Sequence, residues 1–466
     1  MAARRLGGVR CLVAAWIGAT LVAVLSASGW AGASPSSGRL WTASFADAQH
    51  GYDTAQAAVV SPDGGLVYVT GYRGNGHQTG DYLTIAFDAA TGKRVWQRAY
   101  DGPQHLQDFP AAIGVSPNGS TVFVTGTSAG AANEDVATVA YDALTGTLLW
   151  ATRFDGPGHL DDYGSELAVS ADGTKVFVGG SSGTPTDDQD VATIAYDAST
   201  GGQLWLSTYD GPGHGGDGAA GMAASGTGVY VAASSWGGSN DDFATLGYDQ
   251  ATGAQLWATR YDHGDGEEAA DGAVSPDGLS FYVTGYSVGT PPNRDFATVA
   301  YDTSNGSELW VARYSQPGES NAATTVRPSP DGSRVYVTGS NGSADHFADM
   351  VTVGYESASG TQEWVATYNG PADRDDTGDS LGVSPDGSRV YVTGHSFGLS
   401  TDADIETIAY AAATGAGMWS DRLAGPGTDV PNALAVGPTG GLFMVGQHQA
   451  RTGTVDIDWV VAAYAA

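Results

Sequence analysis

Eight tryptophans recur along the chain at a nearly constant spacing of 52 to 55 residues. Each ends the same short pattern, seen clearly between Tyr141 and Trp150 as Tyr-Asp-Ala-Leu-Thr-Gly-Thr-Leu-Leu-Trp. A fixed period of this size indicates one supersecondary unit copied eight times. A chain of 466 residues would by its length suit two or three domains. The copies follow one another without a break, however, so they predict a single domain. The repeat tryptophans are Trp41, Trp96, Trp150, Trp205, Trp257, Trp310, Trp364 and Trp419.

Residues 167–210 show what one repeat encodes. Short segments rich in β-forming residues are separated by Gly, Asp, Ser and Pro, which is typical of antiparallel strands joined by tight turns. The segments are 167–170, 176–180, 191–196 and 203–209. No part of the chain shows sustained helical periodicity, so we expect a protein almost without helix.

A glycine turn follows the first predicted strand of every repeat. Glycine reaches the positive φ that a tight hairpin needs, and Asp or Asn tolerates the neighbouring position. We therefore interpret the acidic residues of these turns as structural. The turns are Asp63–Gly64, Asn118–Gly119, Asp172–Gly173, Thr227–Gly228, Asp277–Gly278, Asp331–Gly332, Asp386–Gly387 and Thr439–Gly440.

The two ends of the repeat array are incomplete in a complementary way. The array begins with a fourth strand over residues 39–45 and ends with a third strand over residues 459–464. If the first segment completes the last unit, the array closes into a ring and has no free sheet edges at its ends. The sequence thus predicts an all-β fold, an eight-bladed β-propeller of four-stranded antiparallel blades closed by its N-terminal strand.

Residues 1–33 have the pattern of a secretory signal peptide. Arg4, Arg5 and Arg10 flank an uncharged apolar stretch over residues 11–27, and small residues at 31–33 suit cleavage after Ala33. A retained membrane anchor is the alternative, although the stretch is short and rich in alanine. We expect a secreted protein whose mature chain, residues 34–466, is one propeller without a membrane span. Export by the general or the twin-arginine route stays open.

The mature chain is strongly acidic and has no cysteine. Removing the three leader arginines from a formal charge of −32 leaves −35. Such a surface disfavours nucleic acids and anionic membranes and attracts cations, although solubility alone would also account for it. Cys11 lies in the predicted leader, so the core and the ring must hold the secreted fold without disulfides. We expect a monomer.

The recurring pattern Ala-Tyr-Asp-x-x-Thr-Gly-x-x-Leu-Trp resembles the tryptophan-docking motif of eight-bladed quinoprotein propellers, the pyrroloquinoline-quinone-binding-like superfamily. It is also similar to short β-propeller repeats of secreted bacterial proteins. The resemblance covers residues 39–466 and implies that each repeat tryptophan packs between neighbouring blades, where its N–H finds a carbonyl.

The resemblance implies fold rather than activity. Quinoprotein dehydrogenases use a vicinal Cys–Cys disulfide, a calcium held by Glu and Asn, and an Asp base. The mature chain has no cysteine and no Cys-x-x-Cys-His site, and no segment matches the Glu, Asn and Asp set. We therefore expect no bound pyrroloquinoline quinone.

The loops from strand four to the next strand one should share a face with the loops between strands two and three. This face has the longer and more varied loops, so we expect function there. Three four–one loops share the pattern Asp-Gly-Pro-x-His with a later Asp, where carboxylates and Gly suit calcium and added His could suit zinc or copper. A purely turn-forming role is the alternative. The candidate metal ligands are Asp101, His105, Asp108, Asp155, His159, Asp162, Asp210, His214 and Asp217; degenerate copies follow at residues 262–268 and 373–376.

An aspartate also ends the loop between strands two and three in all eight repeats. Since a catalytic group is needed once, we favour a corner role, in which each carboxylate accepts backbone N–H groups. The alternative is a carboxylate ring that holds cations or a basic partner. The residues are Asp81, Asp135, Asp190, Asp242, Asp295, Asp349, Asp404 and Asp458.

A catalytic site would need residues that break the repeat. Trp236 does so, as a surface for a sugar or aromatic ligand or as a filler between blades, and so do the loops at His77, His346, His395 and His448. No nucleophile-elbow motif supports a hydrolytic triad, and no pair of carboxylates stands out for glycoside cleavage. We assign no catalytic residue.

Two functions remain from the sequence. The first is a secreted, non-enzymatic binding or scaffold module that meets a protein or glycan through its acidic loop face, with calcium as a candidate ligand. The second is an extracellular enzyme, either a quinone-dependent oxidoreductase or a polysaccharide lyase or hydrolase. A cluster of individual polar residues near the channel mouth would favour the enzyme.

Overall fold

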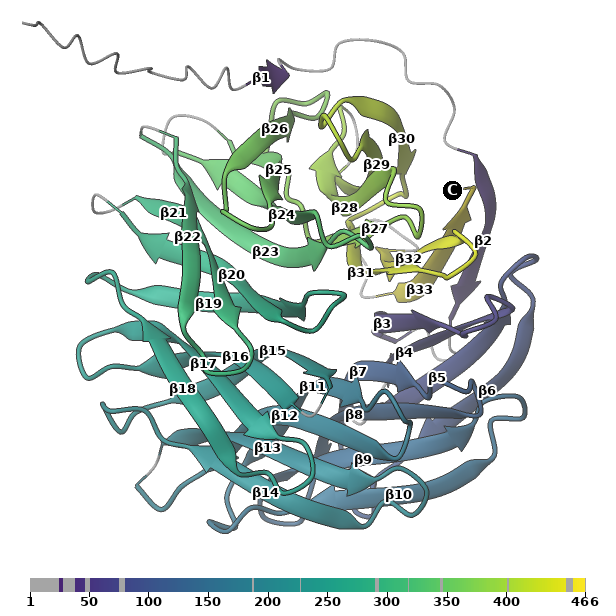
Figure 1. Cartoon of the computed structure of the whole chain (residues 1–466). Coiled ribbons are helices and arrows are strands. Elements are labelled where there is room, and N and C mark those ends of the chain that lie inside the picture. The colour runs from purple at the N-terminus through teal and green to yellow at the C-terminus, as the bar shows by residue number, and fades with distance from the viewer. Residues whose placement is uncertain are drawn as a thin grey trace, which may run out of the picture.

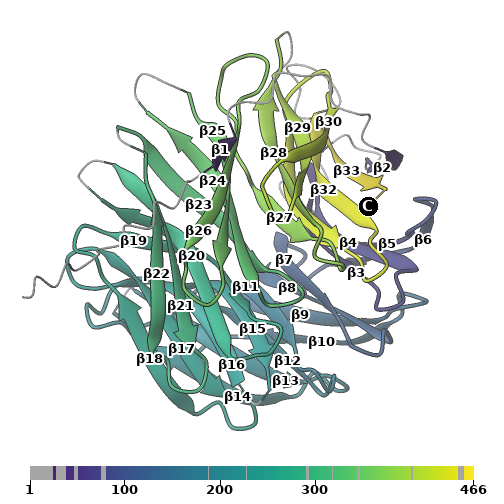
Figure 2. The same cartoon turned by 45° about the horizontal axis from the view of Figure 1, so that its top comes forward.

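The computed structural model describes residues 25–27, 38–46, 51–74, 80–186, 188–226, 228–289, 293–316, 318–343, 347–399, 402–449 and 456–465. These residues form strands and turns and contain no helix, as the sequence predicts. No candidate membrane-spanning helix occurs among them. The strands make eight sheets arranged around a ring (Figures 1 and 2), which confirms the eight-bladed β-propeller.

Seven blades are built from consecutive strands, and the eighth combines both ends of the propeller. Blades one to four are β3(Asp53–Val60), β4(Leu66–Gly74), β5(Gly80–Asp88), β6(Arg94–Tyr100); β7(Asp108–Val115), β8(Thr121–Ala129), β9(Glu134–Asp142), β10(Leu148–Phe154); β11(Asp162–Val169), β12(Lys175–Gly183), β13(Gln189–Asp197), β14(Gln203–Tyr209); and β15(Asp217–Ser225), β16(Gly228–Trp236), β17(Asp241–Asp249), β18(Gln255–Tyr261). Blades five to eight are β19(Glu267–Val274), β20(Ser280–Val288), β21(Arg294–Asp302), β22(Glu308–Tyr314); β23(Ser320–Pro328), β24(Arg334–Gly342), β25(Asp349–Glu356), β26(Gln362–Tyr368); β27(Ser380–Val383), β28(Arg389–Phe397), β29(Ala403–Ala411), β30(Gly417–Leu423); and β31(Asp429–Val436), β32(Leu442–Gln449), β33(Ile457–Tyr464) with β2(Arg39–Phe45).

The strands of the third blade show where sequence patterns underestimate strand length. The fourth strand, β14, has the predicted bounds, but β11 begins at Asp162, five residues before the predicted start. Residues 162–164 and 166 pair with residues 179–182 of β12. Three of them, Asp162, Gly164 and Glu166, are of residue types with low β-propensity. Tertiary context overrides propensity here, because the neighbouring strand supplies the backbone partners.

The repeat tryptophans lie between adjacent blades. Seven of them donate the indole N–H to a backbone carbonyl in the turn between strands three and four of the next blade, at 2.8–3.2 Å. The pairs are Trp41–Ala89, Trp96–Ala143, Trp150–Ala198, Trp205–Gln250, Trp257–Thr303, Trp310–Ser357 and Trp364–Ala412. Each indole therefore joins two repeats by apolar burial and by one hydrogen bond.

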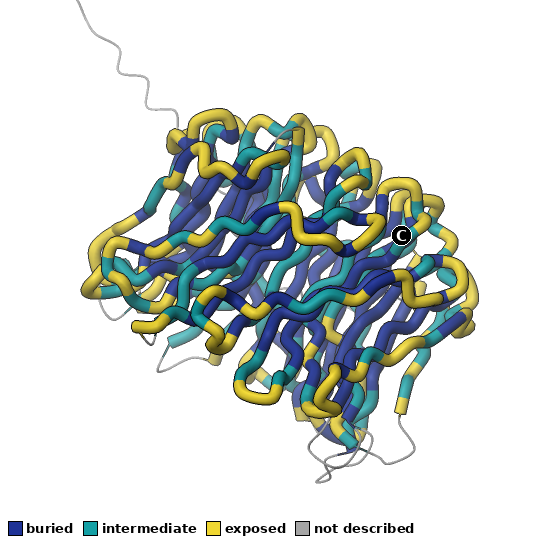
Figure 3. Tube along the Cα trace, turned by 90° about the horizontal axis from the view of Figure 1, so that it is seen from below, coloured by how far each residue is buried: buried dark blue, intermediate teal, exposed yellow. Residues whose placement is uncertain are grey.

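The hydrophobic core is divided among the blade junctions. One cluster of buried hydrophobic residues lies at each of the eight junctions. Buried stretches run along the strands inside the molecule, and exposed residues gather at the turns and loops (Figure 3). The cluster at the eighth and first blades includes Val445 and Ile85. Side-chain hydrogen bonds cross the same junction, among them those from Asn432 Nδ2 to the Ala55 carbonyl at 2.7 Å and from Trp459 Nε1 to the Tyr72 carbonyl at 2.9 Å. Packing thus continues from the last blade to the first.

The N-terminal strand β2 is the outer strand of the eighth blade. It pairs antiparallel with β33, with Phe45 opposite Trp459. Arg39 Nε lies 2.9 Å from Asp421 Oδ2 in the seventh blade, so β2 contacts the blades on both sides through this ion pair and Trp41. Ahead of it, β1(Leu25–Ala27) adds parallel to the outer edge of β26. The remainder of the predicted leader lies outside the described residues, so its cleavage stays a prediction.

One predicted hairpin turn is placed differently by the structure. We expected its glycine at Gly228, but Ser225 pairs with Gly228 and the positive φ of 58° belongs to Gly226. Strand β15 ends at Ser225 and β16 begins at Gly228, so this turn is shorter than in the other repeats and its glycine lies two positions earlier than predicted. In the other seven repeats the predicted turn glycine has a positive φ.

Removing residues 34–46 should greatly lower the thermal stability of the mature protein, because β33 would lose its outer partner strand and the Ala89 carbonyl its hydrogen bond from Trp41. Melting temperatures of chains starting at residues 34 and 47 provide the comparison. A shortened chain that melts like its parent would show that β2 does not hold the ring together.

Gly306→Ala should lower the free energy of unfolding by about 1–3 kcal/mol, because an alanine at its φ of 71° is strained. A methyl group there would also lie 2.5 Å from the Trp257 ring. The matched control is Gly216→Ala, whose methyl group would meet no atom within 4 Å. Urea unfolding checks both variants, and equal losses would contradict the docking argument.

Candidate functional site

The two sets of loops expected to share a face are in contact there. Between the second and third blades, Asn133 Nδ2 in the β8–β9 loop donates to the Leu160 carbonyl in the β10–β11 loop at 2.8 Å. The Glu134 amide donates to Asp161 Oδ1 at 2.9 Å. We call the surface formed by the β-strand two–three and four–one loops the loop face.

Carboxylates from two adjacent blades converge on the loop face at four successive junctions. Each group has one Asp from the two–three loop or third strand of one blade, one from the following four–one loop, and one acidic residue that opens the next inner strand. One oxygen from each member lies within 4.8 Å of the others. These carboxylate triads are Asp81, Asp101 and Asp108; Asp135, Asp155 and Asp162; Asp190, Asp210 and Asp217; and Asp242, Asp262 and Glu267.

The triads unite two residue sets that the sequence analysis kept apart. Six of the nine candidate metal ligands belong to the first three triads, as their loop and inner-strand members. The third member comes from the regular aspartates that we interpreted as corner residues. The sequence did not predict which of these carboxylates lie together, because the members of a triad are up to 27 residues apart, as in Asp81 and Asp108.

The inner-strand carboxylates of the first three triads are buried and accept a hydrogen bond from the Asp-Gly-Pro turn. Asp108 is fully buried, and its Oδ2 accepts the Gly102 amide at 2.7 Å. A Cβ at Gly102 would lie 2.7 Å from Asp108 Oδ1 and 2.5 Å from Ser128 Oγ, so this approach requires glycine. The Gly156–Asp162 and Gly211–Asp217 pairs repeat the bond at 2.5 and 2.6 Å. Part of each candidate site therefore also stabilises its turn.

The structure separates the three candidate histidines from the inner-strand carboxylates. Each ring Nδ1 lies 2.7–2.9 Å from the loop Asp four residues earlier, and 75–78% of each imidazole is exposed. The backbone φ of His105, His159 and His214 is 49–53°, and this left-handed conformation turns the ring back over its own loop. The bond to that Asp raises the pKa of each imidazole. The histidines cap the loop Asp rather than complete a mixed metal site.

Arginines neutralise most of the regular aspartates, which corrects the favoured interpretation that these accept backbone N–H groups. An arginine near the end of the outer strand reaches beneath the loop to the carboxylate in several blades. The ion pairs are Arg153–Asp135 at 2.6 Å, Arg260–Asp242 at 2.5 Å, Arg313–Asp295 at 2.8 Å and Arg422–Asp404 at 3.1 Å; Arg73 pairs with Asp81 from β4. In the third blade Thr208 stands at this arginine position.

The third triad consequently has the most perturbed carboxyl. No arginine or lysine pairs with Asp190 among the residues that the structure describes. Burial, followed by repulsion from Asp210, Asp188 and Asp217, raises the pKa of Asp190 to about 6. Burial likewise raises the pKa of Asp217. A bound cation would offset both effects.

One group in the seventh blade looks like a hydrolytic arrangement but has the wrong geometry. His395 Nδ1 lies 2.8 Å from Thr377 Oγ1 and 3.2 Å from Asp379 Oδ2. A nucleophile and an orienting carboxylate must meet opposite ring nitrogens, whereas both groups here meet the same one. The cluster therefore does not support hydrolysis.

The other residues that break the repeat offer no further site. Trp236 is half-buried rather than exposed, and its ring lies close against Gly213 and Gly215 in the neighbouring four–one loop. His448 lies 2.8 Å from the buried Asp429 of its own blade. The positions of His77 and His346 fall outside the described residues.

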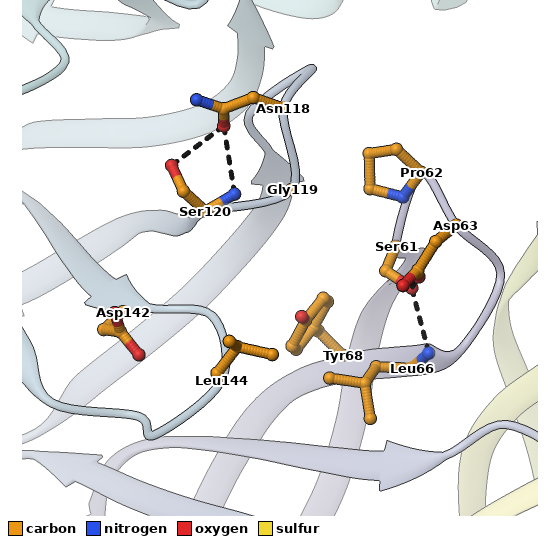
Figure 4. Close-up of a pocket in the computed structure, with 10 residues that line it drawn as sticks. All are labelled: Ser61, Pro62, Asp63, Leu66, Tyr68, Asn118, Gly119, Ser120, Asp142 and Leu144. Atoms are coloured by element: carbon orange, nitrogen blue, oxygen red, sulfur yellow. Dashed lines mark hydrogen bonds between the residues drawn. The ribbon is translucent and has the colours of Figure 1, made fainter.

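A pocket of about 560 Å³ lies on the opposite face, between the first and second blades (Figure 4). Its polar groups are engaged in turns. Asp63 Oδ1 accepts Ser61 Oγ at 2.5 Å, and Asp142 Oδ1 accepts Thr145 Oγ1 at 2.7 Å. The side chain of Leu144 points toward Tyr68 across the pocket. With its carboxylates committed to turns, this hollow is a weaker candidate than the loop face.

Comparisons with known proteins agree with the fold. A PQQ-repeat family model, described as outer membrane protein assembly factor BamB, matches residues 5–125, 82–235, 132–421 and 296–458. No curated protein sequence is significantly similar to the chain.

Solved structures of several different proteins are similar. Quinohemoprotein alcohol dehydrogenase from Comamonas testosteroni is 13% identical, with a TM-score of 0.54 over 91% of this chain and 76% of that one. Chaetomium thermophilum Sqt1, bound to the N-terminus of a ribosomal protein, is 14% identical, with a TM-score of 0.58 over 92% and 100%. The C-terminal WD40 domain of Sif2 is 10% identical, with a TM-score of 0.59 over 93% and 100%. At these identities the likeness shows the fold alone.

Without divalent cations, stability should fall as the pH rises from about 4 to about 6. The folded-state pKa of Asp190, about 6, exceeds its ordinary value of 3.8. The folded state therefore holds this proton more tightly, and the stability linked to it is present below pH 4 and lost through pH 6. Asp190→Asn should flatten this part of the profile. Urea midpoints between pH 4 and 7 in EDTA test it, and parallel profiles would contradict the assignment.

Proposed function

We propose that this chain, which belongs to the PQQ-repeat family described as outer membrane protein assembly factor BamB, is a non-enzymatic binding module that acts through its acidic loop face. The observation that carries the proposal is the convergence of carboxylates at successive blade junctions. Their position is repeated, as a binding surface requires, rather than unique, as a catalytic centre requires.

Calcium is the ligand that best suits the first three triads. Carboxylate oxygens are hard ligands, and calcium accepts six to eight of them in irregular geometry. Each triad offers carboxylate oxygens from two blades. A cation there would offset the repulsion that raises the pKa of Asp190.

A protein with a basic surface, or a glycan bridged through calcium, is the partner class that fits this face. The mature chain would have a formal charge of −35, which speeds association with cationic partners and opposes nucleic acid. The family description as an assembly factor supports a protein partner. In this proposal the protein is secreted through its leader and acts as a monomer, with no bound quinone.

The test is the melting temperature of the chain starting at residue 34, first in EDTA, then with calcium, then with calcium and pyrroloquinoline quinone. A ligand that binds only the folded state at a hundred times its Kd adds about 2.7 kcal/mol of stability. We expect calcium to raise the melting temperature and quinone to add nothing further.

The matched variant combines Asp101→Asn, Asp155→Asn and Asp210→Asn, which removes the exposed member of each of the first three triads. It should lose the part of the calcium effect that these three triads contribute. Glu308→Gln, an exposed residue on β22, removes charge away from the loop face and should keep that effect. A wild-type melt unmoved by calcium would overturn the calcium role, and a shift with quinone would restore the dehydrogenase alternative.

A further inference from the structure

The fourth junction differs from the first three in its loop. Its sequence, Asp262-His263-Gly264-Asp265-Gly266-Glu267, lacks the Asp-Gly-Pro turn and opens the inner strand β19 with a glutamate. Gly264 and Gly266 have φ values of 113° and 120°, which only glycine adopts readily. The longer Glu267 side chain therefore comes from a loop of different course, although it reaches the same place beside Asp242 and Asp262.

Two buried carboxylates at this junction each have one oxygen without a hydrogen-bond partner among the residues that the structure describes. Asp242 is 4% exposed and Glu267 is 1% exposed. Asp242 Oδ2 pairs with Arg260 at 2.5 Å and Glu267 Oε1 accepts the Ser287 hydroxyl at 2.8 Å, whereas Asp242 Oδ1 and Glu267 Oε2 have no partner. A buried polar atom left unpaired is costly, so two of them, contributed by adjacent blades, indicate a missing ligand.

The spacing and charge of the group match a divalent cation. One oxygen each from Asp242, Asp262 and Glu267 lies within 4.8 Å of the others. Two oxygens bound to one calcium at 2.3–2.6 Å lie at most about 5 Å apart. Three carboxylates and the paired Arg260 leave a charge of −2, which one divalent cation balances. Burial raises the pKa of Glu267, and the hydrogen bond from Ser287 offsets part of that rise. A bound cation would also oppose it.

The other triads provide fewer unpartnered buried oxygens. Asp108 and Asp162 each have one such oxygen, and each also accepts a glycine amide. Both oxygens of Asp217 are used, by the Gly211 and Trp236 amides. The fourth triad thus combines the deepest burial of two carboxylates with the largest unsatisfied acceptor capacity.

We propose that Asp242, Asp262 and Glu267 form a calcium site of higher affinity than the other triads, located between the fourth and fifth blades. The site ties β17 to β19 through the ion, with Asp262 closing it from the loop. The inference rests on the proposed function, because it assumes that the loop face binds cations. It adds that the tightest site lies at the junction whose loop departs most from the repeat.

The experiment measures terbium luminescence of the chain starting at residue 34, with calcium as competitor, to give the number of sites and their affinities. Glu267→Gln keeps the shape and the Ser287 contact but removes the charge, and it should weaken the tightest site at least tenfold. Asp262→Asn, in an exposed loop residue, should weaken it as well without disturbing the buried carboxylates. Asp210→Asn in the third triad is the matched control and should leave the tightest site unchanged.

Folding of each variant is checked by its melting temperature in EDTA. Glu267→Gln should melt at or above the wild-type temperature, because it removes an uncompensated buried charge. If Glu267→Gln and Asp262→Asn leave the tightest site intact while Asp210→Asn removes it, this inference is wrong and the calcium role of the first three triads stands. If the wild-type protein binds neither terbium nor calcium, both fail.

Discussion

The indole hydrogen bond between neighbouring blades is the contact on which the rest of the molecule depends. A four-stranded blade has two apolar faces and cannot bury either of them alone. Each repeat tryptophan covers one face of the junction, and its N–H satisfies a carbonyl that the next blade's turn would otherwise leave unpaired. The left-handed glycine beside that carbonyl leaves room for the ring, as at Gly306 against Trp257. Turn, indole and junction therefore form one unit.

Fixing the junctions also fixes the loop face. Because seven of the eight junctions share this contact, the two–three loop of one blade lies beside the four–one loop that enters the next. Whether a junction gathers three carboxylates then depends on single residues. The position of Asp101 is taken by Ser315, Asn369, Ala424 and Ala46 at the later junctions. The described triads consequently occupy one half of the ring of a symmetric fold.

Much of the fold could be predicted because the same strand and turn pattern, weak in one copy, recurs eight times. One copy of β14 is an ordinary short strand, but eight copies with a tryptophan at the same position leave little freedom for the architecture. Errors occurred where local chemistry competes with pairing, as at the polar start of β11 and at the turn moved to Gly226. The candidate site was predicted in part. Asp101 and Asp108 lie together as expected, but His105 turns away because of its left-handed backbone.

The sequence by itself determined the number of blades, the strand order and seven of the eight hairpin turns between strands one and two, since these follow from periodicity and from residues such as glycine that act on their own backbone. Only the tertiary structure decided which charges meet. Asp135 is neutralised by Arg153, Asp190 has no such partner in the part of the chain that the structure describes, and Asp242 meets Glu267 from the next blade. These relations depend on distances between strands that are remote along the chain, and such distances exist only once the blades are docked.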